Sequence, residues 1–283
     1  MRLEGTLSFY HRKKMLPDSF FDFTCAVCYQ YWENIGVASV CKGLGNLRAM
    51  EYPGRVIIIG RDRADRNYVV LYAITGRSPS SQSRKLVVEG NTVWTEPVDE
   101  KALKSGKRDL LIYPAICIQR GIAVSNGKQT EDIRDQLMQS VSSSAVLHSS
   151  LMRWSYEPDA PHFTPRISGC ILPSHSASLS TITRASDGSS LKRIYDVPLI
   201  GGKGKLVATY RGEDRDPLPS FQDEPLDVEI EGNNAEEAAL DVYQALAPKK
   251  KGKDYRVAVA CVFTWNLPED EFDIHILHRQ ERF

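Results

Sequence analysis

The sequence predicts an α+β fold in which β-sheets pack face to face and helices cover the outside. Many short segments rich in β-branched and aromatic residues follow one another between turns that contain Gly, Asn or Asp, a pattern typical of strands. Only two segments have convincing helical patterns, and they lie far apart with strands on both sides. A sheet-on-sheet core with an outer helix layer accommodates this order of elements.

The strand pattern starts after a less regular N-terminal segment and continues to the end of the chain. Gly90 and Asn91 predict a hairpin turn between two strands. Pro114 interrupts an apolar run and indicates either a sheet edge or a bulge, because proline cannot donate a ladder hydrogen bond. The predicted strands lie at 54–60, 67–75, 84–96 (the hairpin), 108–118, 120–127, 166–172, 178–184, 192–200, 204–210, 255–265 and 271–279.

The first helix is predicted to begin at Thr130, a good N-cap residue that is followed by two acidic residues. Apolar residues recur at every fourth position and form one stripe. A serine run weakens the pattern, so the helix should end between that run and Met152. The stripe consists of Ile133, Leu137 and Val141.

The second helix is predicted over residues 235–247. Asn234 is its candidate N-cap, and Glu237 lies three residues further on, as in a capping box. The predicted buried face consists of Ala239, Val242, Tyr243 and Leu246.

Length, composition and charge narrow the class of protein. The chain has 283 residues, enough for one large domain or two small ones. Lys plus Arg and Asp plus Glu both number 36, and this neutral balance argues against a nucleic-acid-binding protein. It leaves room for a local basic pocket that binds one phosphate. The sequence contains no apolar run long enough to span a membrane, which argues against a membrane protein.

The six cysteines are scattered, as in a reduced cytoplasmic protein. Cys25 and Cys28 form a C-x-x-C motif, but only Cys41 and His11 are near enough in sequence to complete a zinc site. We therefore favour two reduced cysteines over a metal site. The N-terminus lacks the apolar region of a secretory signal, so the expected location is cytoplasmic.

Four polar stretches supply the groups that could carry chemistry. In "YAITGRSPSSQSR" a strand leads into a Ser-rich loop with two arginines, which could cradle a phosphate or form an exposed polar loop. The other three stretches are "LIYPAI" with "VSNGKQTEDI" downstream, "YEPDAPHFTPRISG" and "ATYRGEDRDPLPSFQDEP". The Gly-rich "GGKGK" lacks P-loop spacing and predicts a β-turn.

Taken in order, these stretches resemble the archaeal-type IMP cyclohydrolase family, and "P-L-P-S-F-x-x-E-P" points to its longer bacterial-type branch. The resemblance includes S-N-G-x-x-T-[DE] and Y-E-x-D-A-x-x-x-T-P-R-I and extends from about Tyr52 to Phe263. It implies a four-layer αββα sandwich like that of the N-terminal nucleophile hydrolases. Residues 1–46, which have no counterpart in the family, would then be an N-terminal extension before a cyclohydrolase-like domain at 47–283.

The resemblance implies an enzyme without a cofactor or metal that closes the purine ring of a small-molecule nucleotide. Its substrate would be 5-formamidoimidazole-4-carboxamide ribonucleotide and its product IMP. Such an enzyme must hold the two amides in contact, bind a phosphate and move protons. The expected catalytic residues are Tyr113, Glu157 and Asp159. The expected substrate-binding residues are Arg77, Ser78, Arg84, Asn126 and Arg166.

Alternatives remain open at this point. Pro114 stands where the family usually has Asn, so the chain could be a diverged cyclase or amidohydrolase that acts on another amide. A non-catalytic nucleotide-binding protein is a third hypothesis. The carboxylates of Glu157 and Asp159 could instead cap local N–H groups in their turn. The sequence also leaves open whether the protein forms a homo-oligomer.

Overall fold

The computed structural model describes residues 42–98, 112–249 and 252–279. The C-x-x-C motif and most of the predicted extension at 1–46 lie outside these residues, as does the start of the predicted strand at 108–118. No helix among the described residues is long and apolar enough to cross a membrane.

One antiparallel sheet has six strands. They are β1 (Arg55–Arg61), β2 (Tyr68–Thr75), β10 (Lys203–Ala208), β11 (Leu226–Glu229), β12 (Arg256–Asn266) and β13 (Glu271–His278). Their order across the sheet is β11-β10-β1-β2-β12-β13. All eight residues of β2 are buried, since both faces of this sheet are covered. The sequence pattern did not predict the short strand β11.

The second antiparallel sheet has seven strands. They are β3 (Arg84–Glu89), β4 (Thr92–Pro97), β5 (Tyr113–Ile118), β6 (Ile122–Ser125), β7 (Arg166–Ile171), β8 (Ala177–Arg184) and β9 (Ser190–Asp196). They lie in chain order across the sheet. Consecutive strands therefore pair with their neighbours, which requires only short local connections for several of them.

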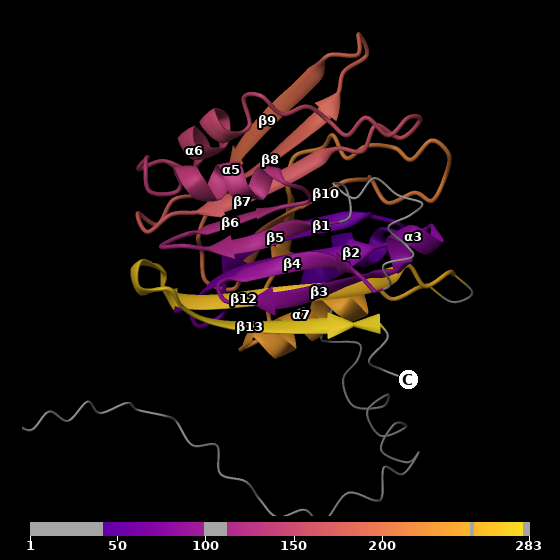
Figure 1. Cartoon of the computed structure of the whole chain (residues 1–283). Coiled ribbons are helices and arrows are strands. Elements are labelled where there is room, and N and C mark those ends of the chain that lie inside the picture. The colour runs from indigo at the N-terminus through magenta and orange to yellow at the C-terminus, as the bar shows by residue number, and fades with distance from the viewer. Residues whose placement is uncertain (1–41, 99–111, 250–251, 280–283) are drawn as a thin grey trace, which may run out of the picture. The chain divides into compact units, whose positions relative to one another are not determined.

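Two sheets between two helix layers form the sandwich (Figure 1). The sheets face each other, with β1 against β7 and β12 against β3, and their apolar side chains form one continuous core. Helix α7 (Ala235–Ala245) covers the six-stranded sheet, and α5 (Gln129–Gln136) and α6 (Ser143–Ser150) cover the seven-stranded sheet. The predicted α+β fold with packed sheets and outer helices is confirmed.

Residues just before the predicted domain boundary belong to this core. The turn η1 (Lys42–Leu44) and the short helix α2 (Gly45–Ala49) pack against β11 and α7. Leu44 and Leu47 are buried in the main core. The packed part of the chain therefore begins no later than Lys42.

The predicted helix, from Thr130 to an end between the serine run and Met152, is wrong in two respects. The chain forms two helices, α5 and α6, with a break that exposes 85% of Val141. Ser142 precedes α6 in an extended conformation, so the serine run starts a helix instead of ending one. Thr130 is not an N-cap, because α5 already begins at Gln129; its hydroxyl donates to the carbonyl of Gly127.

Two local predictions in the seven-stranded sheet are confirmed. The hairpin turns at Gly90, whose φ of 57° is in the left-handed region that glycine tolerates. Pro114 lies inside the sheet, and the register of β4 and β5 shifts there, so of the two alternatives the bulge is correct. The register skips Ala115, so the ladder of hydrogen bonds is interrupted directly after Pro114, the residue that has no N–H.

Helix α7 also follows its predicted pattern. The Asn234 side chain accepts a hydrogen bond from the N–H of Glu237 at 2.8 Å. The Glu237 carboxylate accepts one in return from the N–H of Asn233, one residue before the expected partner. The four predicted core residues of this helix are all buried.

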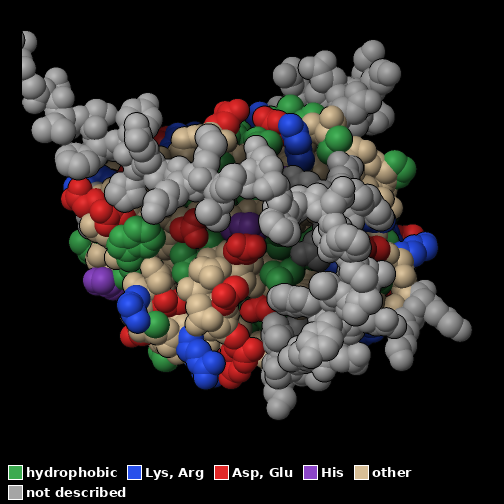
Figure 2. Space-filling model, turned by 90° about the horizontal axis from the view of Figure 1, so that it is seen from below, with side chains coloured by type: hydrophobic (Ala, Val, Ile, Leu, Met, Phe, Trp, Pro, Cys, Tyr) green, Lys and Arg blue, Asp and Glu red, His purple; other side chains and the backbone are tan. Residues whose placement is uncertain are grey.

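Several acidic side chains lie on the face of the molecule that is seen from below (Figure 2). Asp241 of α7 is a half-buried acid with two acidic neighbours. Burial, then repulsion from Glu231 and Glu237, raises its pKa from 3.8 to about 6. The folded state thus binds this proton more tightly than the unfolded state, so stability is lost as pH rises from about 4 to 6.

Replacing Asp241 with Asn should therefore stabilise the protein at neutral pH. Removing the ionisable group should raise the free energy of unfolding by about 1 kcal/mol at pH 7, after allowance for solvent screening, and change it little at pH 4. Urea unfolding of both proteins at the two pH values measures this difference. A gain that is equal at both pH values would contradict an ionisation effect.

Candidate active site

The candidate site contains four charged or hydroxyl-bearing residues, each of which is the first residue of a strand. Arg84, Tyr113 and Arg166 are the first residues of β3, β5 and β7. Alternate strands of an antiparallel sheet run in the same direction, so the starts of β3, β5 and β7, and with them these residues, lie at the same end of the strands. Arg55 begins β1 in the facing sheet, which packs against β7.

Glu157 supplies the acid of this cluster. Its loop runs into β7, and its N–H donates to the carbonyl of Thr164 at 2.9 Å, so the backbone holds it in place. Its side chain is buried, with Oε1 3.9 Å from a guanidinium nitrogen of both Arg55 and Arg166. Burial raises the pKa of Glu157 more than these arginines lower it. The carboxyl group therefore holds a proton more readily than an exposed glutamate does.

Arg166 is fixed by its surroundings from three directions. Its Nε donates to the carbonyl of Ser155 at 2.8 Å, and Nη1 donates to Oε1 of Gln129 at 3.1 Å. Its guanidinium also lies 4.8 Å from the centre of the Trp154 ring. Because its guanidinium already has these partners, we expect Arg166 to orient Glu157 and not to bind a ligand directly.

Arg55 and Arg84 are buried and have polar atoms without partners. Nε of Arg55 and both Nε and Nη1 of Arg84 form no hydrogen bond with any described residue. Burial, and then repulsion from Arg55, lowers the pKa of Arg84. For Arg55, burial alone would lower the pKa, but attraction to Glu157 and to three neighbouring tyrosines together outweighs it, and the pKa is raised. Three arginines around one carboxylate leave an excess of positive charge that an anion would neutralise.

Two tyrosines place hydroxyl groups beside this charge. The hydroxyls of Tyr72 and Tyr113 lie 2.8 Å apart in a hydrogen bond, and both side chains are buried. Burial, and then the neighbouring Tyr113, raises the pKa of Tyr72 well above its usual value. Tyr72 therefore stays protonated at neutral pH and can donate a hydrogen bond.

Asp159 lies in the same loop as Glu157 but contacts other groups. Its carboxylate accepts hydrogen bonds from the N–H of Thr164 at 2.7 Å and from the Thr164 hydroxyl. The Thr164 hydroxyl in turn lies 2.6 Å from the hydroxyl of Tyr210. These bonds close the turn and tie it to the β10 side of the sandwich.

Asn126 joins the start of α5 to the start of β7. Its side-chain oxygen accepts from the N–H of Ile167 at 2.9 Å and from Gln129 at 3.1 Å, and its nitrogen donates to the carbonyl of Pro165 at 2.9 Å. The amide thus fixes the strand end that carries Arg166.

Arg77 and Ser78 already have protein partners. The guanidinium of Arg77 binds Asp214 at 2.9 Å and Asp216 at 2.7 Å and lies 5.6 Å from the Tyr52 ring centre. The Ser78 hydroxyl accepts from the N–H of Ser81 and caps α3 (Pro79–Gln82).

The structure therefore brings five of the expected residues to the same end of the strands in the seven-stranded sheet: Arg84, Tyr113, Asn126, Glu157 and Arg166. Sequence reasoning missed Arg55 and Tyr72. The one available signal was a charged residue directly before the apolar run "VIIIG". Among the described residues, no group of three or more His, Cys, Asp or Glu side chains could hold a metal ion.

The chain is thus a two-sheet α+β sandwich with a buried cluster of three arginines around one acid, an arrangement that suits a small anionic ligand. The family model described as IMP cyclohydrolase-like protein matches residues 52–264, which include every residue of this site. The chain belongs to the IMP cyclohydrolase-like family. No curated protein gave a match to the sequence.

Proposed function

We propose that this protein is an IMP cyclohydrolase that acts on 5-formamidoimidazole-4-carboxamide ribonucleotide. The observation that supports this proposal best is a buried acid with a raised pKa among three arginines, in a chain of this family. The carboxamide nitrogen forms a bond to the formyl carbon, and the formyl carbon–oxygen bond breaks. The oxygen leaves as water and takes one proton from each of the two nitrogens.

Glu157 is the residue we assign to proton transfer. A buried carboxyl group with a raised pKa can give a proton to the departing oxygen and, once ionised, take one from a nitrogen. The backbone hydrogen bond to Thr164 and the two neighbouring arginines fix its position. This fixed position matters because proton transfer requires hydrogen-bond distance.

We assign two tasks, stabilising the negative charge that develops on the formyl oxygen and binding the ligand, to Arg55, Arg84 and Tyr113. Guanidinium and hydroxyl donors that are already oriented stabilise an oxyanion without reorganisation, as the formyl oxygen requires when it is attacked. Arg84 has two unpartnered nitrogen atoms for this purpose. Asn126, Asp159 and Arg166 act as positioning residues in this proposal.

Two finer assignments complete the proposal. The αββα order of layers supports a fold related to that of the N-terminal nucleophile hydrolases, within the longer bacterial-type branch of the family. The proposed chemistry uses no covalent nucleophile, because ring closure is intramolecular and depends on holding the two amides together. We also propose a cytoplasmic location, where a pathway to IMP would supply the substrate.

The direct test is an ultraviolet assay of IMP formation with purified full-length protein. We expect turnover well above the rate without enzyme and no dependence on added nicotinamide cofactors. Absence of turnover with substrate shown to be intact by chromatography would contradict the proposal, whether or not the protein binds IMP.

The diverged-substrate alternative rests on Pro114, and replacing this residue with Asn separates the two hypotheses. Under our proposal the variant gains no cyclohydrolase activity. It should lose about 1–3 kcal/mol of stability, because a polar amide would be buried in a strand whose residues are all buried. A clear rise in IMP formation, measured beside urea unfolding, would favour the diverged enzyme instead.

A further inference from the structure

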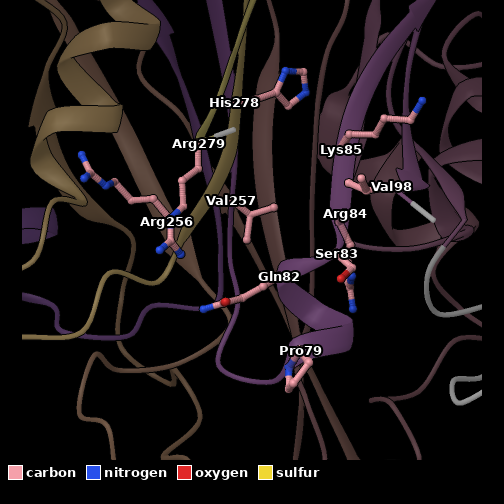
Figure 3. A pocket seen from close by; sticks show the side chains of 10 residues that line it. All are labelled: Pro79, Gln82, Ser83, Arg84, Lys85, Val98, Arg256, Val257, His278 and Arg279. Carbon is pink, nitrogen blue, oxygen red and sulfur yellow. The ribbon is translucent and has the colours of Figure 1, made fainter. Parts of the chain in front are cut away.

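A cavity of about 480 Å³ opens where the edges of the two sheets meet. Strand β3, the edge of the seven-stranded sheet, forms one wall, and β12 and β13 of the six-stranded sheet form the other (Figure 3). Cavities of this size hold small ligands such as a mononucleotide.

The walls of this cavity are strongly basic. Four of its ten lining residues are Lys or Arg and none is Asp or Glu: the four are Arg84, Lys85, Arg256 and Arg279. Two of these cations form ion pairs with acids that do not line the cavity: Lys85 with Glu96 at 3.2 Å, and Arg256 with Asp254 at 2.7 Å. Among the described residues, four cations and two anions leave a net positive charge at the mouth of the cavity.

Arg84 connects the cavity to the candidate active site. Its side chain lines the cavity, and its charge also acts on Glu157 and Tyr72. It is 8% exposed, and two of its three guanidinium nitrogens have no partner among the described residues. A buried cation with unused donors where the two regions meet is well suited to bind an anionic group.

We propose that this cavity is the phosphate subsite of the ribonucleotide, with Lys85 and Arg279 as its specificity residues. This inference rests on the proposed function. Arg256 is held by Asp254 and by the Tyr243 ring at 4.4 Å, so it shapes the wall. Lys85 has 42% of its side chain exposed. Arg279 donates through Nη1 to the carbonyl of Asp254 at 3.0 Å, which fixes its guanidinium beside the cavity. The phosphate lies on the β12–β13 side of Arg84, and the reacting amides lie on the Glu157 side.

Calorimetric titration of full-length protein with IMP and with inosine, which lacks the phosphate, tests this subsite. The double variant Lys85→Gln, Arg279→Gln should weaken IMP binding about 10- to 100-fold, as expected for two lost charge-assisted hydrogen bonds, and leave inosine binding unchanged. Lys203→Gln is the matched control, because Lys203 forms a similar exposed ion pair with Glu229 at 2.7 Å on another strand. It should leave both affinities unchanged.

The outcomes separate the subsite from the function. The subsite is overturned if the double variant loses affinity for IMP and inosine equally. It is also overturned if a double variant whose thermal unfolding matches wild type loses no affinity for IMP. Either result holds even if IMP formation is observed. Selective loss of IMP affinity supports the subsite even if no cyclisation is detected, in which case only the proposed function fails. Weaker IMP binding at higher salt in wild type, with a smaller dependence in the double variant, would add support.

Discussion

Replacing Glu157 with Gln is expected to lower the rate of IMP formation about 10²–10⁴-fold, the usual contribution of a general acid–base. Glutamine keeps the shape of the side chain but can neither give nor take the proton. Affinity for IMP should change far less, because Arg84 and the basic cavity remain. Steady-state kinetics and calorimetry on the folded variant measure the two effects separately.

The pH dependence of kcat provides a second measure of the same role. Burial raises the pKa of Glu157, so the wild-type profile should show an ionisation above the usual range of a glutamic acid. This ionisation should be absent from the Glu157→Gln variant. A profile shared by both proteins would assign the proton transfer to another group.

Asp159→Asn is the matched control, since both acids lie in one loop. Its carboxylate accepts two hydrogen bonds from Thr164, so the variant should lose about 1–2 kcal/mol of stability and keep most of its turnover. If the two variants lost turnover equally, the division into a catalytic and a positioning acid would be wrong.

Replacing Arg84 with Met is expected to stabilise the fold while it weakens the site. A buried guanidinium with two unpartnered nitrogens lies near Arg55, so an apolar side chain of similar length should raise the free energy of unfolding by about 1 kcal/mol or more. IMP binding should weaken at least about tenfold, because a charged hydrogen-bonding group to the ligand is lost. Urea unfolding and calorimetry report these opposite changes.

Arg77→Met is the comparison for this prediction. Arg77 binds two carboxylates, so its loss leaves Asp214 and Asp216 without their partner and should lower stability slightly. Its effect on IMP affinity should be smaller than that of Arg84→Met. A large loss of stability in Arg84→Met would instead identify Arg84 as a structural ion-pair residue.

Local patterns in the sequence predicted elements where local chemistry decides the outcome. Gly90 tolerates the left-handed turn of the hairpin, and Asn234 caps α7 through its own side chain. The same reasoning failed at Val141, where a regular apolar spacing continued across a break and the residue is exposed. Spacing shows which residues share a face, but only packing decides whether that face is covered.

By itself, the sequence determined the α+β class, most strands, and the loop that holds Glu157 before β7. Only the tertiary structure decided which side chains meet there. β1 pairs with β10 across some 150 residues, and Arg55 reaches Glu157 from the facing sheet. The order of the strands and the packing of one sheet on the other depend on contacts between residues far apart in the sequence, which no local pattern predicts. For this reason Arg55 and Tyr72 were found only in the structure, whereas the motif around Glu157 already made it a candidate in the sequence.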